Sequence, residues 1–272
     1  MRRRTTLSWP SVVVVAFALT ACGSVADGSP GQAQPSIDSS HALAAWKDFP
    51  AAANPRPIVL LGQPVIDPRS GFRNDADKMA YTDGNLVLGT SLPEMTSPPA
   101  GGRLVSASSA LQVLVGPRHN APLGAPTLTV TGARLARATF ATDRGAQSLP
   151  VWVFTLRGVA DPASVLALPA GDYWPKAGTA INQVVAVPAG SQDSRQVTVR
   201  FIGGASGTGP CTVAYSASVA ESATAVMVTP VAQANPASKG VFCTLEGYRR
   251  SLTVTLSAPL AGRVLLTPDA GG

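Results

Sequence analysis

Few residues in this sequence are of types that carry hydrolytic chemistry. A serine or cysteine hydrolase needs a base beside its nucleophile, usually a histidine, and the chain holds only His41 and His119. His41 lies in a segment rich in Gly, Ser and Pro, whereas His119 lies in the run Gly116-Pro117-Arg118-His119-Asn120. His119 is therefore the candidate base or ligand-binding histidine, and a solvated loop histidine is the more ordinary interpretation.

Glutamates number three, and Glu221 is the candidate site residue among them. A glycosidase needs two carboxylates on either side of a cleft. Glu221 continues the alternation of a predicted strand and would point inward if that strand reached it. The interpretation that we favour ends the strand at Ala220 and pairs Glu221 with an arginine such as Arg249, Arg250 or Arg263.

Metal-binding and cofactor-binding patterns are incomplete. Asp75, Asp77 and Asp83 partly match a calcium loop, but Met79 occupies the next ligand position and no glutamate closes the loop. The glycine-rich stretch 203–209 lacks the lysine and the following helix of a phosphate-binding loop. We therefore expect no metal ion and no cofactor.

Two neighbouring aromatic residues, Tyr173 and Trp174, suit a binding platform. They follow Gly171 and Asp172 and precede Pro175. Exposed, such a pair would stack on a sugar or a peptide. Buried, it would fill a junction between two domains, and this is the interpretation that we favour.

The N-terminus has the layout of an export signal. Three arginines precede the short apolar run 12–19, which is too short to span a bilayer. The following residues, Leu19-Thr20-Ala21-Cys22, resemble the bacterial lipobox. We expect cleavage before Cys22, a diacylglyceryl lipid on its thiol and anchoring to the outer face of the cell membrane. Arg3 and Arg4 also fit twin-arginine export, but Thr6 stands where that signal usually has a large apolar residue, so general secretion is favoured.

The two remaining cysteines, Cys211 and Cys243, are expected to form a disulfide outside the cytoplasm. Metal binding would need more ligands than these two, and no histidine lies near either in the sequence. The spacing also differs from that of a CxxC redox pair.

Composition restricts the class of protein. Charged residues make up 13% of the chain and hydrophobic residues 45%, which argues against disorder and indicates a compact, turn-rich fold. The formal charge falls from +6 to +3 when the three arginines of the signal are removed. A nucleic-acid partner is therefore not expected.

The chain divides into four segments in this interpretation: a signal peptide (1–21), a flexible tether (22–44), a small α+β domain (45–170) and a C-terminal domain (171–272). The tether ends in a short helix that begins after Ser39 or Ser40 and runs through Trp46. Within the α+β domain (45–170), residues 106–115 have helical spacing. Strands are expected at 127–130, 135–142 and 151–157, and turns over most of 64–99.

The last hundred residues predict a series of short strands. They are expected at 181–187, 196–202, 212–219, 224–231, 251–257 and 263–267. Alternating apolar and polar residues with turn signals between them predict an antiparallel β-sandwich, so that the whole protein is mostly β. The disulfide would join the start of the third of these strands to the connection before the fifth.

Several segments resemble those of uncharacterised secreted lipoproteins of high-GC Gram-positive bacteria (actinobacteria). They include Arg56–Leu60, Thr142-Asp143-Arg144-Gly145 with the strand that follows it, and Pro259-Leu260-Ala261-Gly262-Arg263. The resemblance spans most of the mature chain, but each piece is short. It implies an envelope lipoprotein with a largely β fold and transfers no activity.

Together these features predict a membrane-anchored extracytoplasmic lipoprotein that acts as a non-catalytic binding module of the cell envelope. Its expected partners are the membrane, through the lipid, and an envelope protein or a wall polymer. The alternative is an envelope hydrolase acting on wall or peptide substrates through His119, Glu221 or the pair Asp75 and Asp77.

Overall fold

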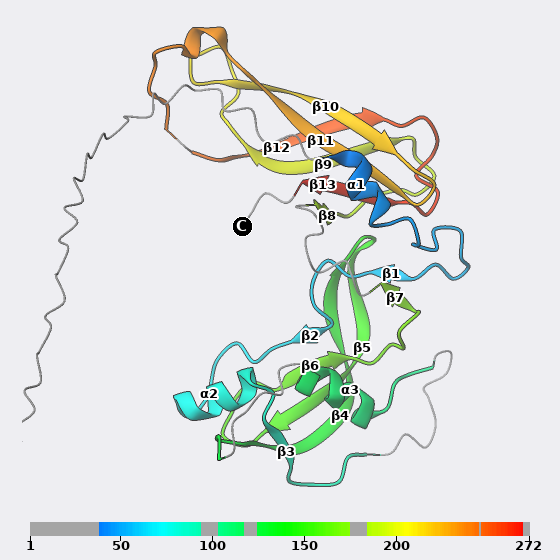
Figure 1. Ribbon diagram of the computed structural model, residues 1–272, viewed down its shortest axis with the longest axis vertical. Helices are drawn as coiled ribbons and strands as arrows, with labels where there is room; N and C mark the ends of the chain where they lie inside the picture. The colour runs from blue at the N-terminus through cyan, green and yellow to red at the C-terminus, as the bar shows by residue number, and fades with distance from the viewer. Residues whose placement is uncertain (1–37, 94–102, 117–123, 175–183, 245, 269–272) are drawn as a thin grey trace, which may run out of the picture.

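The computed structural model describes residues 38–93, 103–116, 124–174, 184–244 and 246–268 (Figure 1). Its helices are α1 (Ser39–Ala44), α2 (Asp75–Thr82), α3 (Ala107–Val115) and the 3-10 turn η2 (Pro236–Ser238). Its strands are β1 (Ile58–Val59), β2 (Val65–Ile66), β3 (Leu86–Leu88), β4 (Leu128–Thr142), β5 (Gly145–Leu156), β6 (Ala163–Leu166), β7 (Tyr173–Trp174), β8 (Val184–Ala186), β9 (Gln196–Gly203), β10 (Val213–Glu221), β11 (Ala225–Ala234), β12 (Tyr248–Thr255) and β13 (Val264–Pro268). The fold is therefore mostly β, as predicted.

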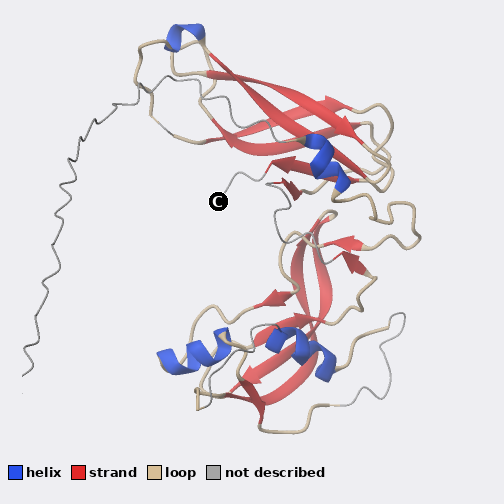
Figure 2. Ribbon diagram, viewed as in Figure 1, coloured by secondary structure: helices blue, strands red, loops and turns tan. Residues whose placement is uncertain are grey.

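The N-terminal half is built on a five-stranded sheet of order β2-β6-β5-β4-β3. Helices α2 and α3 share one core with one face of this sheet, where Trp152, Phe154 and Leu156 of β5 are buried. The other face buries Val151 and Val153 against neighbouring side chains. Both faces of β5 are thus covered. Figure 2 shows the helices beside the lower part of this sheet.

Helix α3 forms where its spacing predicts. Ser106 is its N-cap, and the Ser106 hydroxyl accepts a hydrogen bond from the Ser109 backbone N–H at 3.1 Å. Ala110, Leu111 and Leu114 are buried on one face. The N-cap and the spacing of the buried residues are local features, and they were sufficient to predict this helix.

Helix α2 was not predicted, because the stretch 64–99 was interpreted mostly as turns. Asn74 caps it by accepting from the Asp77 backbone N–H at 2.8 Å. Only Ala80 and Tyr81 of its apolar residues are buried. Two buried apolar residues give too weak a periodic pattern to stand out from a turn-rich sequence.

Strand β4 is a single element, whereas the sequence suggested two separate strands. It pairs with β5 along almost its whole length and shifts register between Val130 and Gly132. Glycine weakens the local strand signal, and a bulge at such a position is common. The cross-strand hydrogen bonds with β5 keep the strand continuous.

The C-terminal half contains a four-stranded sheet of order β10-β11-β13-β8 and a two-stranded sheet of β12 and β9. Val197 and Val199 of β9 share a buried core with Val226 and Val228 of β11. Each strand of the predicted series overlaps a strand of the structure, although residues 181–183 lie outside the described residues and β12 begins at Tyr248, before the predicted 251–257. The pairing of β11 with β13 is parallel rather than antiparallel, because β12 crosses to the other sheet between these two strands.

The last residues of the predicted tether (22–44) and those just after it pack on the C-terminal half, so the predicted tether extends too far: α1 is a helix with Ala42 buried. Asp38 caps α1, before the predicted N-cap at Ser39 or Ser40, and the helix ends at Ala44 rather than at Trp46. Trp46 and Phe49 are each 2% exposed and share a core with Met227 of β11 and Leu266 of β13. The N-terminal segment therefore covers the face of the four-stranded sheet that does not contact β9 (Figure 1).

Candidate functional site

A buried ion pair lies where the two halves meet, at the tip of the β4–β5 hairpin. Asp143 is 1% exposed, and its Oδ2 lies 2.5 Å from an Nη of Arg56. Its Oδ1 accepts a hydrogen bond from the Val59 backbone N–H at 3.0 Å. The Arg56 guanidinium also lies over the Phe49 ring, 5.0 Å from its centroid. These contacts fix the hairpin tip to the segment that leads into β1.

Arg144, the next residue of the hairpin tip, contacts the backbone of the same segment with its side chain. Its guanidinium donates to the carbonyl oxygens of Arg56 at 2.8 Å and Pro57 at 3.2 Å. Burial, with the nearby charge of Arg56, lowers the pKa of the Arg144 guanidinium. The Asp143 carbonyl oxygen accepts from the Ala189 backbone N–H at 3.2 Å. Thr142-Asp143-Arg144-Gly145 is thus a structural junction that also joins the hairpin to the C-terminal half.

Tyr173 and Trp174 form β7 and lie in the same junction. They pair in parallel with Ile58 and Val59 of β1. The Trp174 ring lies 6.4 Å from that of Trp46 in a stacked arrangement and 5.4 Å from that of Phe49 in an edge arrangement. Burial raises the pKa of the Tyr173 phenol. These contacts are those of a packed domain junction, the interpretation favoured from the sequence.

Strand β10 reaches Glu221, so the prediction that it ends at Ala220 was wrong. The pairing of Glu221 with an arginine is confirmed, since its Oε2 lies 2.7 Å from an Nη of Arg263. Its Oε1 accepts from the Ser257 backbone N–H at 2.8 Å. Burial alone would raise the pKa of the Glu221 carboxyl, but the hydrogen bonds from Ser257 and Arg263 outweigh it and lower this pKa.

Arg263 uses its remaining donors to hold one loop. Its guanidinium, 10% exposed at the side chain, donates to the carbonyl oxygens of Ala258, Pro259 and Leu260 at 2.8–3.1 Å. Glu221 is therefore the counterion of a loop-holding arginine. A lowered pKa and a fixed partner suit this structural role and do not suit a general acid, which needs a raised pKa.

The other sequence candidates do not form a joint site with Glu221 in the described structure. Asp77 lies in the first turn of α2 and pairs with Arg73 at 3.2 Å, whereas Asp75 is exposed. His119 and Cys22 lie outside the described residues. Among the described residues, no group of three or more His, Cys, Asp and Glu is placed to hold a metal ion.

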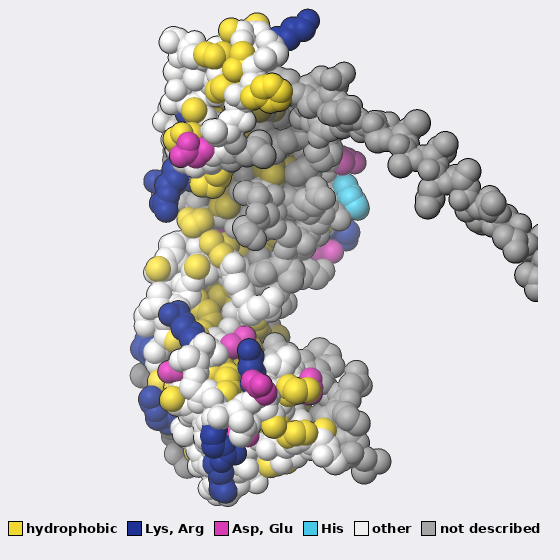
Figure 3. All heavy atoms as spheres, turned by 90° about the vertical axis from the view of Figure 1, so that its left-hand side faces the viewer, with side chains coloured by type: hydrophobic (Ala, Val, Ile, Leu, Met, Phe, Trp, Pro, Cys, Tyr) yellow, Lys and Arg dark blue, Asp and Glu magenta, His cyan; other side chains and the backbone are white. Residues whose placement is uncertain are grey.

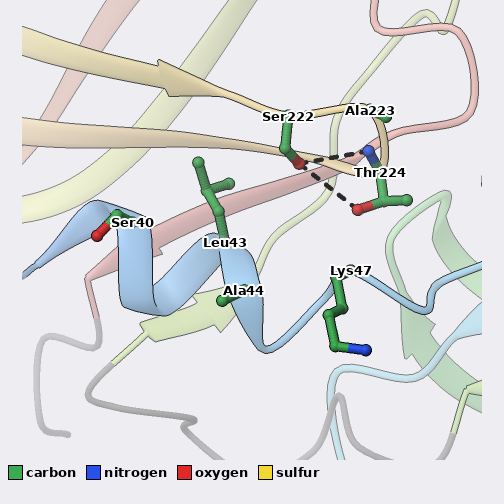
Figure 4. A pocket seen from close by; sticks show the side chains of 7 residues that line it. All are labelled: Ser40, Leu43, Ala44, Lys47, Ser222, Ala223 and Thr224. Carbon is green, nitrogen blue, oxygen red and sulfur yellow. Dashed lines mark hydrogen bonds between the residues drawn. The ribbon is translucent and has the colours of Figure 1, made fainter.

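A shallow pocket of about 240 Å³ lies between α1 and the β10–β11 turn (Figure 4). It is lined by Ser40, Leu43, Ala44, Lys47, Ser222, Ala223 and Thr224. The Ser222 hydroxyl accepts a hydrogen bond from the Thr224 backbone N–H at 3.3 Å. The Lys47 ammonium forms an ion pair with its neighbour Asp48 at 2.8 Å. The pocket shows where the N-terminal segment meets the C-terminal half and offers little polar chemistry.

Comparisons with protein-family models, with curated proteins and with solved structures found no match to this chain. Among the helices of the described residues, none is long and apolar enough to cross a membrane.

The feature that the sequence did not reveal lies beside the disulfide. Cys211 and Cys243 are bonded, as predicted, and join the start of β10 to the connection before β12. Phe242, next to Cys243, has a relative exposure of 103%, and Val241 of 39%. Ile202 at 58% and Tyr248 at 42% lie at the same end of β9 and β12. We call these four residues with the disulfide the disulfide end.

Basic side chains accompany the apolar ones there. Arg249 lies directly opposite Ile202 across the β9–β12 pair, and Arg200 is opposite Ser251 on the same exposed face. Lys239 lies three residues before Phe242 and is exposed. Figure 3 shows hydrophobic side chains gathered at the top of the molecule, with Lys and Arg side chains near them.

The base of the disulfide end is rigidly packed. Phe201 and Tyr215 contact edge to face with centroids 4.9 Å apart, and the Arg250 guanidinium lies over the Tyr215 ring at 5.5 Å. The Tyr215 hydroxyl accepts from the Gly204 backbone N–H at 2.8 Å. An aromatic next to a half-cystine in a Gly-rich and Pro-rich connection was the only sequence signal for this surface.

Proposed function

We propose that the protein is a membrane-anchored extracytoplasmic lipoprotein that works as a non-catalytic binding module of the cell envelope, with the disulfide end as its contact surface. In this proposal the two sheets of the C-terminal half form a β-sandwich that presents this end. The observation that carries the proposal is the complete exposure of Phe242 on a loop tied down by a disulfide.

An exposed phenylalanine has a physical cost that binding would remove. Burying a Phe side chain is worth about 1.5–3 kcal/mol, and scattered single exposed apolar residues are ordinary. Here four apolar residues lie at one end of the C-terminal half, and Cys243 fixes the loop that carries two of them. A loop fixed in its exposed position loses little conformational freedom on binding, which favours affinity.

Two of the three candidate carboxylates, Glu221 and Asp77, have arginine partners, as does the buried Asp143, whereas the third candidate, Asp75, is exposed. Asp143 holds Arg56 in the junction, Glu221 holds Arg263, and Asp77 holds Arg73. In each arrangement the carboxylate forms an ion pair with an arginine. This use of acids supports the binding module over the envelope hydrolase.

The anchor is tested by replacing Cys22. We expect the Cys22→Ala chain to be exported without bound lipid, because no thiol is left for the diacylglyceryl group. The measurement is fractionation of cells with detection of protein-bound lipid. A Cys22→Ala chain that still sediments with membranes and carries lipid would contradict the anchor.

The contact surface is tested by capture from washed membranes and wall fragments with immobilised protein. We expect Phe242→Ala to reduce the captured material about tenfold or more. Leu88→Ala is the matched control, since Leu88 is 54% exposed but lies on β3 in the N-terminal half. Equal capture by the native chain and both variants would contradict the proposed surface.

A further inference from the structure

We infer that the partner of the disulfide end is the surface of an anionic lipid bilayer, into which Phe242 inserts. The inference rests on the proposed function, because it names the partner of the same surface. It assigns a second membrane attachment to a protein whose first attachment is the predicted lipid on Cys22. The C-terminal half would then lie along the bilayer between the two attachments.

The composition of the disulfide end fits a membrane interface. Phe242 and Tyr248 supply aromatic rings and Val241 an aliphatic side chain, all exposed. Ile202 is exposed at the same end but on the opposite face of the β9–β12 pair from Tyr248. Aromatic residues that are apolar at one end and polar at the other favour the headgroup region of a bilayer. The Tyr248 hydroxyl donates to Glu246 at 2.7 Å, so its polar end is already satisfied.

The charges near these side chains favour an anionic surface. Arg200, Arg249 and Lys239 are exposed. None of the three forms an ion pair with another described residue. Each Lys or Arg close to an anionic membrane adds to the attraction, and the effect weakens with salt. Among the described residues of this end, Glu246 is the one acidic residue.

The position of the N-terminal segment allows both attachments at once. Helix α1 lies beside the β10–β11 turn, as Figure 4 shows, and the disulfide end lies at the other end of the same two strands. A ten-residue strand such as β11 spans about 33 Å. The residues between Cys22 and Asp38 can span at most about 55–60 Å. A lipid on Cys22 therefore leaves enough chain for the disulfide end to reach the same bilayer.

A partner with a purely apolar surface would contact the apolar side chains of this end but would make no use of its arginines. A bilayer with anionic headgroups accepts the apolar side chains in its outer layer and the basic side chains at its surface in one contact. A protein partner remains an outcome of the test below, because it would also bury Phe242.

The test measures cosedimentation of the mature chain with vesicles. The chain starts at residue 22 and carries Cys22→Ser, so that neither an acyl chain nor the signal segment binds lipid. Vesicles contain phosphatidylcholine alone or phosphatidylcholine mixed with phosphatidylglycerol. We expect binding to the mixed vesicles that falls with added salt. Phe242→Ala should lower the partition coefficient about tenfold or more, and Arg249→Gln about fivefold.

Matched variants control for exposure and charge away from the disulfide end. Leu88→Ala and Arg69→Gln, in exposed positions of the N-terminal half, should leave the partition coefficient unchanged. Circular dichroism of each variant checks folding. Absence of binding to mixed vesicles, or equal binding by Phe242→Ala and the native chain, would overturn the membrane inference. If capture from envelope material still depended on Phe242 in that case, the proposed function would stand with a protein or polymer partner; if it did not, both would fail.

Discussion

At the scale of single residues, the polar side chains of this protein are mainly used to hold loops. Arg263 gives hydrogen bonds to three carbonyl oxygens and to Glu221, so one guanidinium fixes the turn from residue 258 to 262. A guanidinium has five N–H donors in a fixed plane and suits this task better than a lysine. Pro259-Leu260-Ala261-Gly262-Arg263 is therefore explained as a loop-fixing motif.

Glu221→Gln is expected to lower the free energy of unfolding by about 1–3 kcal/mol at neutral pH, because Arg263 loses its charged partner. Urea unfolding monitored by circular dichroism measures this. Asp193→Asn, an exposed acid in the same half, is the control and should change the value by less than about 0.5 kcal/mol. An unchanged midpoint for Glu221→Gln would contradict the structural role.

The same pair gives a pH dependence whose sign can be worked out. The folded-state pKa of Glu221 is lowered from its ordinary value of 4.5, so its contribution is present above that pH. The contribution is lost as the pH falls through the lower folded value. We therefore expect the stability difference between the native chain and Glu221→Gln to be constant at neutral pH and to shrink below about 4.5. A difference that grows on acidification would contradict the assignment.

At the scale of elements, the long β4–β5 hairpin joins the two halves through its tip. Asp143 is expected to dominate this junction, since its carboxylate is the buried counterion of Arg56. Asp143→Asn should cost about 3–5 kcal/mol, because an uncompensated charge stays buried. Asp48→Asn removes an exposed ion pair with Lys47 and should cost less than about 1 kcal/mol. Equal midpoints of the two variants in urea would disprove this account of the junction.

The elements also show which signals the sequence carries. Helix α3 has a cap, a buried stripe and a terminal glycine, and its position was predictable from those local features. Helix α2 is short and polar, and tertiary packing of Ala80 and Tyr81 stabilises it where propensity does not. The parallel pairing of β11 with β13 depends on a crossover through the other sheet, which no local pattern encodes.

At the scale of the whole molecule, the N-terminal segment and the disulfide stabilise the C-terminal half from opposite ends. Trp46 and Phe49 cover one face of its sheet, and Cys211–Cys243 closes a connection of 32 residues at the disulfide end. The cysteine pairing was predictable from the number of cysteines together with the expected extracytoplasmic compartment. The disulfide end was not predictable. The sequence does not distinguish an exposed phenylalanine such as Phe242 from a core phenylalanine, and only the fold reveals its exposure.

Replacing both cysteines by serine is expected to lower the free energy of unfolding by about 3–4 kcal/mol, because the unfolded chain regains the entropy of an open loop. Urea unfolding of the native and double-serine chains tests this. Limited proteolysis should find new cleavage within residues 236–247, with cleavage elsewhere unchanged. Identical proteolysis patterns would show that the disulfide does not hold this connection.

The central claim, that the disulfide end is the contact surface, is tested most directly by photocrosslinking in intact cells. A photoreactive amino acid replaces Phe242, and in a second strain it replaces Val113, which is 48% exposed on α3 in the N-terminal half. The account predicts crosslinked products, with lipid or protein, from position 242 and none of them from position 113. Products that are the same from both positions, or products from position 113 alone, would contradict it.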